Sequence, residues 1–164
     1  MAQDNPARFA PDLATSLNNL SNRLSDAGDG AGALAAILEA VEIRRRLAQD
    51  IPARFVPDLA LSLYNLSLRL SDAGDGAGAL AAIREAVDTH RRLAQDNPAR
   101  FAPDLAVSLN NLSLRLSDVG DGAAALAAIS EAVDTYRQLA QDNPARFASD
   151  LERSLKILDL LERK

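Results

Sequence analysis

The sequence predicts an all-α protein in which helical repeats pack side by side as a solenoid. The first observation is repetition: segments of the type NPARFAPDLA begin at Asn5, Ile51, Asn97 and Asn143, at a constant spacing of 46 residues (51 − 5 = 46). The second is the regular position of the residues that start and end helices: all seven prolines lie in these segments, and all eight glycines lie in the GDGAG-type segments between them. The third is the helical periodicity of the apolar positions.

Each 46-residue repeat is expected to hold two helices. Proline favours the first turn of a helix and glycine ends one, so the first helix is expected from about Pro11 to Ala27, with its stop at Gly28. Asp29 then caps a second helix over about 30–49 by accepting hydrogen bonds from its free N–H groups. The whole chain is expected to be one domain with repeats at 5–50, 51–96 and 97–142, followed by a lone helix at about 149–163.

Apolar residues define one face on each predicted helix. Leucines of the first helix are spaced by four, three and four residues, and the second helix has a face of small and branched residues. In repeat 1 these residues are Leu13, Leu17, Leu20 and Leu24, then Ala33, Ile37, Ala40 and Val41. Two helices cannot bury such faces alone, but stacked neighbours can. The sequence therefore predicts seven helices in one stack.

The last helix differs from the first helices of the repeats. Asp159 stands where the earlier repeats have serine, and Glu162 stands where they have leucine. These positions would face a following second helix, so charge there predicts a capping helix that faces water. The N-terminus has no such cap. Two interpretations fit this end: a first helix that is stable with one side exposed, or a piece excised or engineered from a longer array. The near-identical repeats are explained equally well by recent duplication and by consensus design.

From Leu17, the string LNNLSNRLSDAGDGAGALAAILEAV resembles the tetratricopeptide repeat. That family places large apolar residues at positions such as Leu17 and Leu24, and small residues at positions such as Ser21, Ala33 and Ala40. The LNNL opening is similar to the kinesin light chain variety and to repeat arrays of signalling ATPases. The period departs from the usual 34 residues, and the family's frequent tryptophan is absent. The resemblance implies a right-handed solenoid.

Composition excludes several classes of function. A net charge of −5 and a pI near 4.9 argue against a nucleic-acid partner, which needs a basic face. The chain has no cysteine, which excludes disulfides and zinc–thiolate sites. No apolar run approaches the ~20 residues that span a bilayer, and MAQDNPARF does not resemble a signal peptide. We therefore expect no membrane partner and a cytoplasmic location.

No constellation of residues predicts catalysis, a metal site or a cofactor. His90 is the only histidine, and Arg44 and Tyr136 occupy its position in the other repeats, so it is expected to cover a neighbouring helix. The paired aspartates around each glycine turn lack EF-hand spacing and are expected to be caps. GDGAG lacks the lysine of a phosphate loop. The arginine runs at 44–46 and 91–92 are expected to be solvated surface. The sequence thus predicts a protein that is not an enzyme.

The differences between repeats indicate where a ligand binds. Nine positions differ between repeats 1 and 2, and three of them lie opposite the leucine face of the first helix. In tetratricopeptide proteins this face lines the concave groove that holds an extended peptide or a partner helix. The resemblance therefore implies that the following groove residues line a ligand site: Thr15, Asn18, Asn19, Asn22, Leu61, Tyr64, Asn65, Leu68, Val107, Asn110, Asn111 and Leu114.

The constant asparagines of this face have two alternative roles. The amides of Asn19, Asn65 and Asn111 can bond to a peptide backbone, or they can bridge adjacent repeats. The family's clamp for a C-terminal carboxylate needs basic groove residues, and the nearest are Arg153 and Lys156 on the capping helix. A second variable cluster is expected to be a mostly convex, tolerant surface, to which no function is assigned: Leu38, Arg84, Ser130, Ile43, Thr89, Thr135, Arg44, His90 and Tyr136.

These observations favour a non-enzymatic scaffold that binds a peptide or protein in the groove. The alternative is a structural or self-associating module without a dedicated ligand, in which near-identical repeats stack end to end through the uncapped first helix. A monomer is expected under the first interpretation, and end-to-end association under the second.

Overall fold

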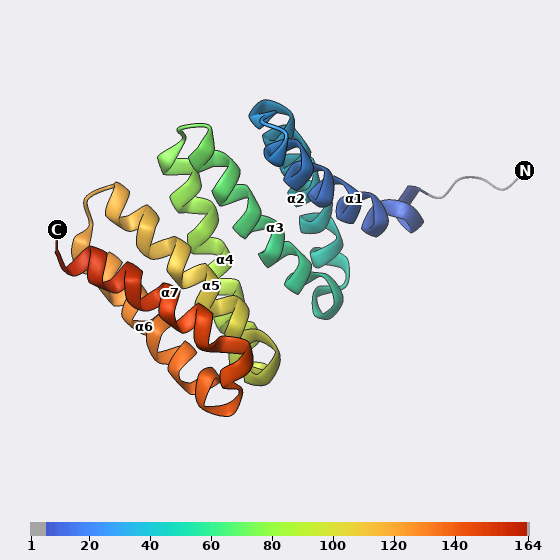
Figure 1. The fold of residues 1–164 in the computed structure, drawn as a ribbon. Coiled ribbons are helices and arrows are strands. Elements are labelled where there is room, and N and C mark those ends of the chain that lie inside the picture. The colour runs from blue at the N-terminus through green and yellow to red at the C-terminus, as the bar shows by residue number, and fades with distance from the viewer. Residues whose placement is uncertain (1–5, 164) are drawn as a thin grey trace, which may run out of the picture. The chain divides into compact units, whose positions relative to one another are not determined.

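The computed structural model describes residues 6–163, which form seven α-helices and, over this range, no strand (Figure 1). The helices alternate between the first and second helices of the repeats. Their bounds are α1 Pro6–Asp26, α2 Gly30–Asp50, α3 Pro52–Asp72, α4 Gly76–Asp96, α5 Pro98–Asp118, α6 Gly122–Asp142 and α7 Pro144–Glu162. The predicted all-α fold of paired helices is confirmed.

The chain divides into two compact units within α4, between Ala82 and Ile83. In unit 1, α2 packs against both α1 and α3, and α1 also contacts α3. In unit 2, α6 packs against both α5 and α7, and α5 contacts α7. The second helix of a repeat therefore packs on two sides: against the first helix of the same repeat, and against the first helix of the next repeat.

The first helices begin earlier than the sequence analysis predicts. They start at Pro6, Pro52, Pro98 and Pro144, so the segment taken as a linker is helical and the last helix does not start near 149. The feature shared by α3, α5 and α7 is proline in the first turn, and in α5 the side chain of Asn97 also accepts from the backbone N–H of Arg100. The second proline of each segment, such as Pro103, lies inside the helix.

The turn between the two helices of a repeat follows the prediction. Gly28, Gly74 and Gly120 have positive φ angles of 82°, 81° and 82°, a conformation that other residues adopt at a cost. The side chain of Asp29 accepts a hydrogen bond of 2.9 Å from the N–H of Gly32. Asp75 and Asp121 cap α4 and α6 in the same way.

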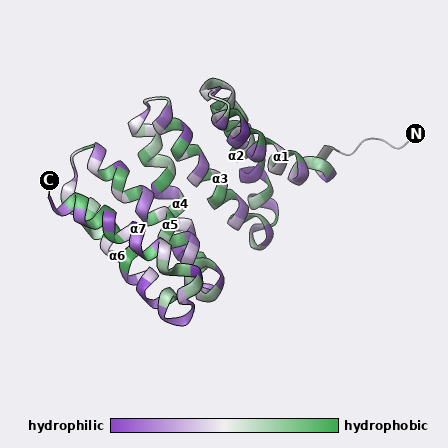
Figure 2. Ribbon diagram, in the orientation of Figure 1, coloured by the Kyte–Doolittle hydropathy of each residue, from purple (hydrophilic) through white to green (hydrophobic). Residues whose placement is uncertain are grey.

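The core combines leucine and phenylalanine side chains of the first helices with alanine, isoleucine and valine side chains of the second helices. Ala40, Ala86 and Ala132 are fully buried, as are the isoleucines one turn before them. Figure 2 shows the result as hydrophobic and hydrophilic residues alternating along each ribbon. Small side chains at these positions let neighbouring helix backbones approach closely.

The end of the chain differs from the repeats as expected. Ser67 and Ser113 are fully buried, whereas Asp159, their counterpart on α7, is exposed. Glu162 is also exposed. The same side of α7 exposes Leu155, so the cap is only partly polar.

Candidate functional site

The predicted groove residues differ widely in exposure. Eight lie on α1 and α3 of unit 1, and four lie on α5 of unit 2. Five of them are exposed: Thr15, Asn19, Asn22, Leu61 and Val107. Four are half-buried, namely Tyr64, Leu68, Asn110 and Leu114, and three are buried, namely Asn18, Asn65 and Asn111.

In unit 1 the exposed part of this surface has a polar side and an apolar side. Helix α1 contributes Thr15, Asn19 and Asn22, all exposed. Helix α3 contributes Leu61, which is 48% exposed, and the half-buried Leu68. The two helices lie side by side, because side chains of α3 donate hydrogen bonds to α1. An apolar strip therefore borders a row of amides and a hydroxyl.

A buried hydrogen-bond network lies beneath this surface. Asn18 Oδ1 accepts from Ser62 Oγ at 3.0 Å and from Asn65 Nδ2 at 3.2 Å. The same contact recurs in unit 2, where Ser154 Oγ donates to Asn110 Oδ1 at 3.0 Å. Asn65 thus bridges adjacent repeats, one of the two roles left open for the constant asparagines. Its counterpart Asn19 is exposed and leaves its amide toward solvent.

Arg44 connects this network to the second helix. Its Nη1 donates to the backbone oxygen of Asp58 at 2.9 Å and to Ser62 Oγ, and Nη2 lies 3.4 Å from Thr15 Oγ1. Only 5% of the residue is exposed. Burial lowers the pKa of the Arg44 guanidinium, and the Asp58 carboxylate acts in the opposite direction.

The expectation of a tolerant convex surface is wrong for Arg44, His90 and Tyr136, which are all buried. Leu38, Arg84 and Ser130 of the same predicted cluster are exposed, as expected, while Ile43 and Thr135 are half-buried and Thr89 is buried. Arg44 is likewise not the solvated surface residue expected of an arginine run. The reason is the second packed side of α2 and α6, which faces the next first helix. A sequence signal existed, because position 44 follows the buried Ile37 by seven residues and so shares its face.

His90 has a buried polar environment in unit 2. Its Nδ1 lies 2.9 Å from Ser108 Oγ of α5, and 4% of the residue is exposed. Burial lowers the pKa of the imidazole, and the Asp104 carboxylate partly offsets this by raising it. The environment favours the neutral ring and gives it a structural hydrogen bond.

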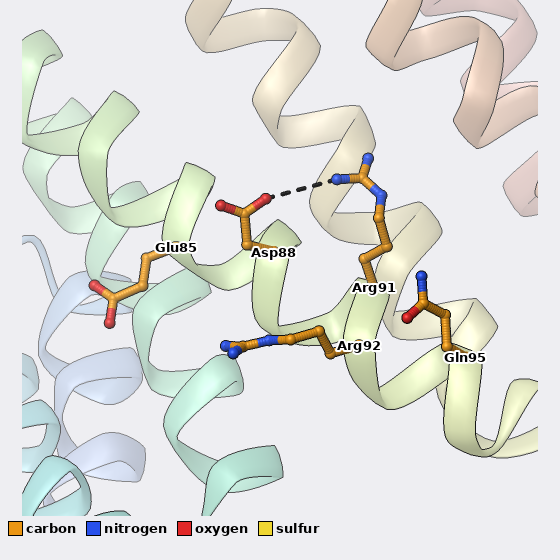
Figure 3. A pocket seen from close by; sticks show the side chains of 5 residues that line it. All are labelled: Glu85, Asp88, Arg91, Arg92 and Gln95. Atoms are coloured by element: carbon orange, nitrogen blue, oxygen red, sulfur yellow. Dashed lines mark ion pairs between the residues drawn. The ribbon is translucent and has the colours of Figure 1, made fainter.

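Polar residues of α4 line a surface hollow of about 470 Å³ (Figure 3). Arg91 pairs with Asp88 at 3.6 Å and, more closely, with Glu131 of α6 at 2.9 Å. Arg92 and Gln95 extend from the next positions and are exposed. Arg91, which faces α6, is thus already paired with acidic residues, and the hollow is a polar surface feature.

No group of three histidine, aspartate or glutamate side chains within 6–163 is placed to hold a metal ion. Over the same residues, no helix combines the length and apolar character needed to span a bilayer.

Comparisons with known proteins agree with the repeat pattern. A family model described as Tetratricopeptide repeat matches residues 13–50, 59–99 and 105–145, which is more than half of the chain. A solved structure titled "Crystal structure of MamA protein" is 16% identical, covers 94% of this chain and 94% of that chain, and has a TM-score of 0.34. No curated protein matches the chain.

Proposed function

Because the chain belongs to the tetratricopeptide repeat family, we propose that it is a non-enzymatic scaffold that binds a peptide or protein on the exposed faces of its first helices. Repeats of this family generally mediate protein–protein interaction, and stacked repeats present extended binding surfaces. The ligand surface consists of the exposed and half-buried groove residues, and the buried asparagines hold the adjacent helices in place.

The observation that carries the proposal is the exposure of Leu61. It is 48% exposed on α3, where repeat 1 has the polar Thr15. Tyr64 and Leu68 continue the same strip, so repeat 2 presents an apolar surface where the neighbouring helix presents hydroxyl and amide groups. Contiguous exposed apolar side chains of this kind often mark interaction sites.

The absence of an enzymatic role is part of the proposal. His90 would be the natural general base, but it is buried against the hydroxyl of Ser108 rather than placed beside a nucleophile in an open site. The exposed aspartates Asp29 and Asp121 are occupied as helix caps. These residues are accounted for by the fold.

The test is a comparison of two surface leucines. Peptide-library selection on the wild-type chain supplies a ligand, whose affinity is then measured for Leu61→Thr and Leu38→Arg. Both changes copy the residue of a sister repeat, and the two leucines are 48% and 47% exposed. Burying a leucine against a partner contributes about 1.5–3 kcal/mol, so Leu61→Thr should weaken binding roughly tenfold or more, while Leu38→Arg on α2 should not. Equal effects of the two changes, or none from Leu61→Thr, would contradict the proposed site.

A further inference from the structure

Helix α1 exposes a face that the other first helices bury. Phe9 is 54% exposed, whereas its counterparts Phe55, Phe101 and Phe147 are 5%, 8% and 7% exposed. The same difference is found two helical turns later on this face. Ser16 is exposed, whereas its counterparts are buried: Ser62 at 0%, Ser108 at 1% and Ser154 at 0%.

Six of the exposed residues of α1 form one continuous strip. At 100° per residue, they fall within an arc of about 100° centred near Ser16. Leu13 and Leu20 are 48% and 47% exposed. The strip, named here the α1 strip, consists of Phe9, Asp12, Leu13, Ser16, Leu20 and Arg23.

The two edges of the α1 strip differ in chemistry. Phe9, Leu13 and Leu20 lie along one edge, and Asp12 and Arg23 lie along the other. Asp12 and Arg23 are both exposed, and neither has an ion pair with another residue in the described part of the chain. Asp12 lies in the first half of α1, and Arg23 lies in the second half.

We propose that the α1 strip binds the α1 strip of a second copy of this chain, in an antiparallel, two-fold symmetric dimer. A two-fold axis at Ser16, perpendicular to the helix, keeps like edges together and reverses their direction. It therefore brings Leu13 of one copy beside Leu20 of the other, and Asp12 beside Arg23.

The complementarity is specific to this orientation. A parallel two-fold pair would instead bring the charged edge of one copy against the apolar edge of the other, so that Asp12 and Arg23 would lie beside leucines without a charge partner. The small side chain of Ser16 at the centre lets the two helices approach closely. The contact is one helix wide, at the small end of interface sizes, below about 1,200 Å². The dimer is therefore expected to dissociate on dilution.

This inference does not require a groove ligand: the apolar edge of the α1 strip lies on the side of α1 opposite Asn18, which contacts α3, and only its Asp12 edge adjoins Asn19. It also differs from end-to-end stacking, which joins the first helix of one copy to the last helix of another. An isologous contact closes on itself and stops at two copies.

The test begins with sedimentation equilibrium of the full chain over a wide concentration range. We expect the average mass to rise from 17.4 kDa toward twice that value and to stop there. Leu20→Glu should raise the dissociation constant at least tenfold. Leu38→Glu, at an equally exposed leucine on α2, is the matched control and should leave the dissociation constant unchanged.

Charge exchange tests the orientation. Asp12→Arg gives a strip with two bases, and Arg23→Asp gives one with two acids, so each variant alone should dimerise at least tenfold more weakly than wild type. An equimolar mixture of the two should form a heterodimer with an affinity near that of wild type. Circular dichroism melting checks that each variant is folded. A wild-type chain that stays monomeric, association that survives Leu20→Glu, or a mixture that does not restore binding would each overturn the proposal.

Discussion

His90 Nδ1 lies 2.9 Å from the hydroxyl oxygen of Ser108, and this contact joins α4 to α5 inside unit 2. Repeat 1 has Arg44 at the same position, hydrogen-bonded to a backbone oxygen and to Ser62, and repeat 3 has Tyr136 packed with Ala106 and Phe147. One buried position therefore carries three chemistries at the contact between consecutive repeats. Only the histidine changes its charge near neutral pH.

The His90 contact predicts a pH dependence of stability. Burial lowers the pKa of His90 below its unfolded value of 6.5, with Asp104 acting in the opposite direction. The unfolded chain therefore binds the proton more readily than the folded one, and stability rises with pH in this range. The contribution of the neutral imidazole is complete above pH 6.5 and is lost as the pH falls toward the folded pKa. Urea unfolding at pH values between 7.5 and 5 measures it.

The matched control for this prediction is His90→Tyr, which copies the residue of repeat 3. Aspartates and glutamates titrate in both proteins, so the difference between wild type and variant isolates the histidine. Wild type should lose more stability than His90→Tyr as the pH falls. A difference between the two that stays constant from pH 7.5 to 5 would refute the assignment.

Two adjacent asparagines provide a second prediction. Asn18→Ala removes the acceptor of two hydrogen bonds and leaves Ser62 and Asn65 without it, at a cost of about 1–3 kcal/mol. Asn19→Ala changes an exposed amide and should stay within about 0.5 kcal/mol of wild type. Chemical denaturation of the two variants under the same conditions makes the comparison. Equal stabilities would show that the buried network contributes little.

Local rules account for what the sequence predicted well. The repeat period, the pairing of helices and the cap at Asp29 depend on residues close together in the chain, and the structure has all three. The helix starts were wrong because each repeat offers two prolines compatible with a first turn. The fixed φ angle of the earlier proline suffices in α3, where Ile51 gives no side-chain cap, and Asn97 adds a cap in α5.

The candidate site was harder to predict because it depends on neighbours from the next repeat. Arg44 is an ordinary surface arginine if α2 has one packed side, and a buried one once α3 covers the other side. Asn18 likewise lies on the face opposite the leucines, yet it is buried because α3 supplies Ser62 and Asn65. Variation between repeats identified these positions, but it did not distinguish contacts between repeats from contacts with a ligand.

Close approach of helix backbones at alanine gives a third prediction. Ala132 is fully buried on α6, whereas Ala127 on the same helix is exposed. Ala132→Leu should overpack the contact and destabilise the protein by about 1–3 kcal/mol. Ala127→Leu should change stability by less than about 0.5 kcal/mol. Thermal and urea denaturation measure both, and an unchanged midpoint for Ala132→Leu would be inconsistent with tight packing there.

The polar residues at the end of α7 give the last prediction. Asp159 and Glu162 are exposed beside Leu155, which is 38% exposed, so Asp159→Ser with Glu162→Leu would join these positions into a larger apolar surface. Made in the Leu20→Glu background, where the α1 strip is blocked, the double change should make an otherwise monomeric chain associate. In the wild-type background, the double change should produce species larger than a dimer, because each chain can then associate both through the α1 strip and through the altered end of α7. Sedimentation velocity over a range of concentrations distinguishes these cases. If the double variant sediments like its parent in both backgrounds, Asp159 and Glu162 do not limit association at this end.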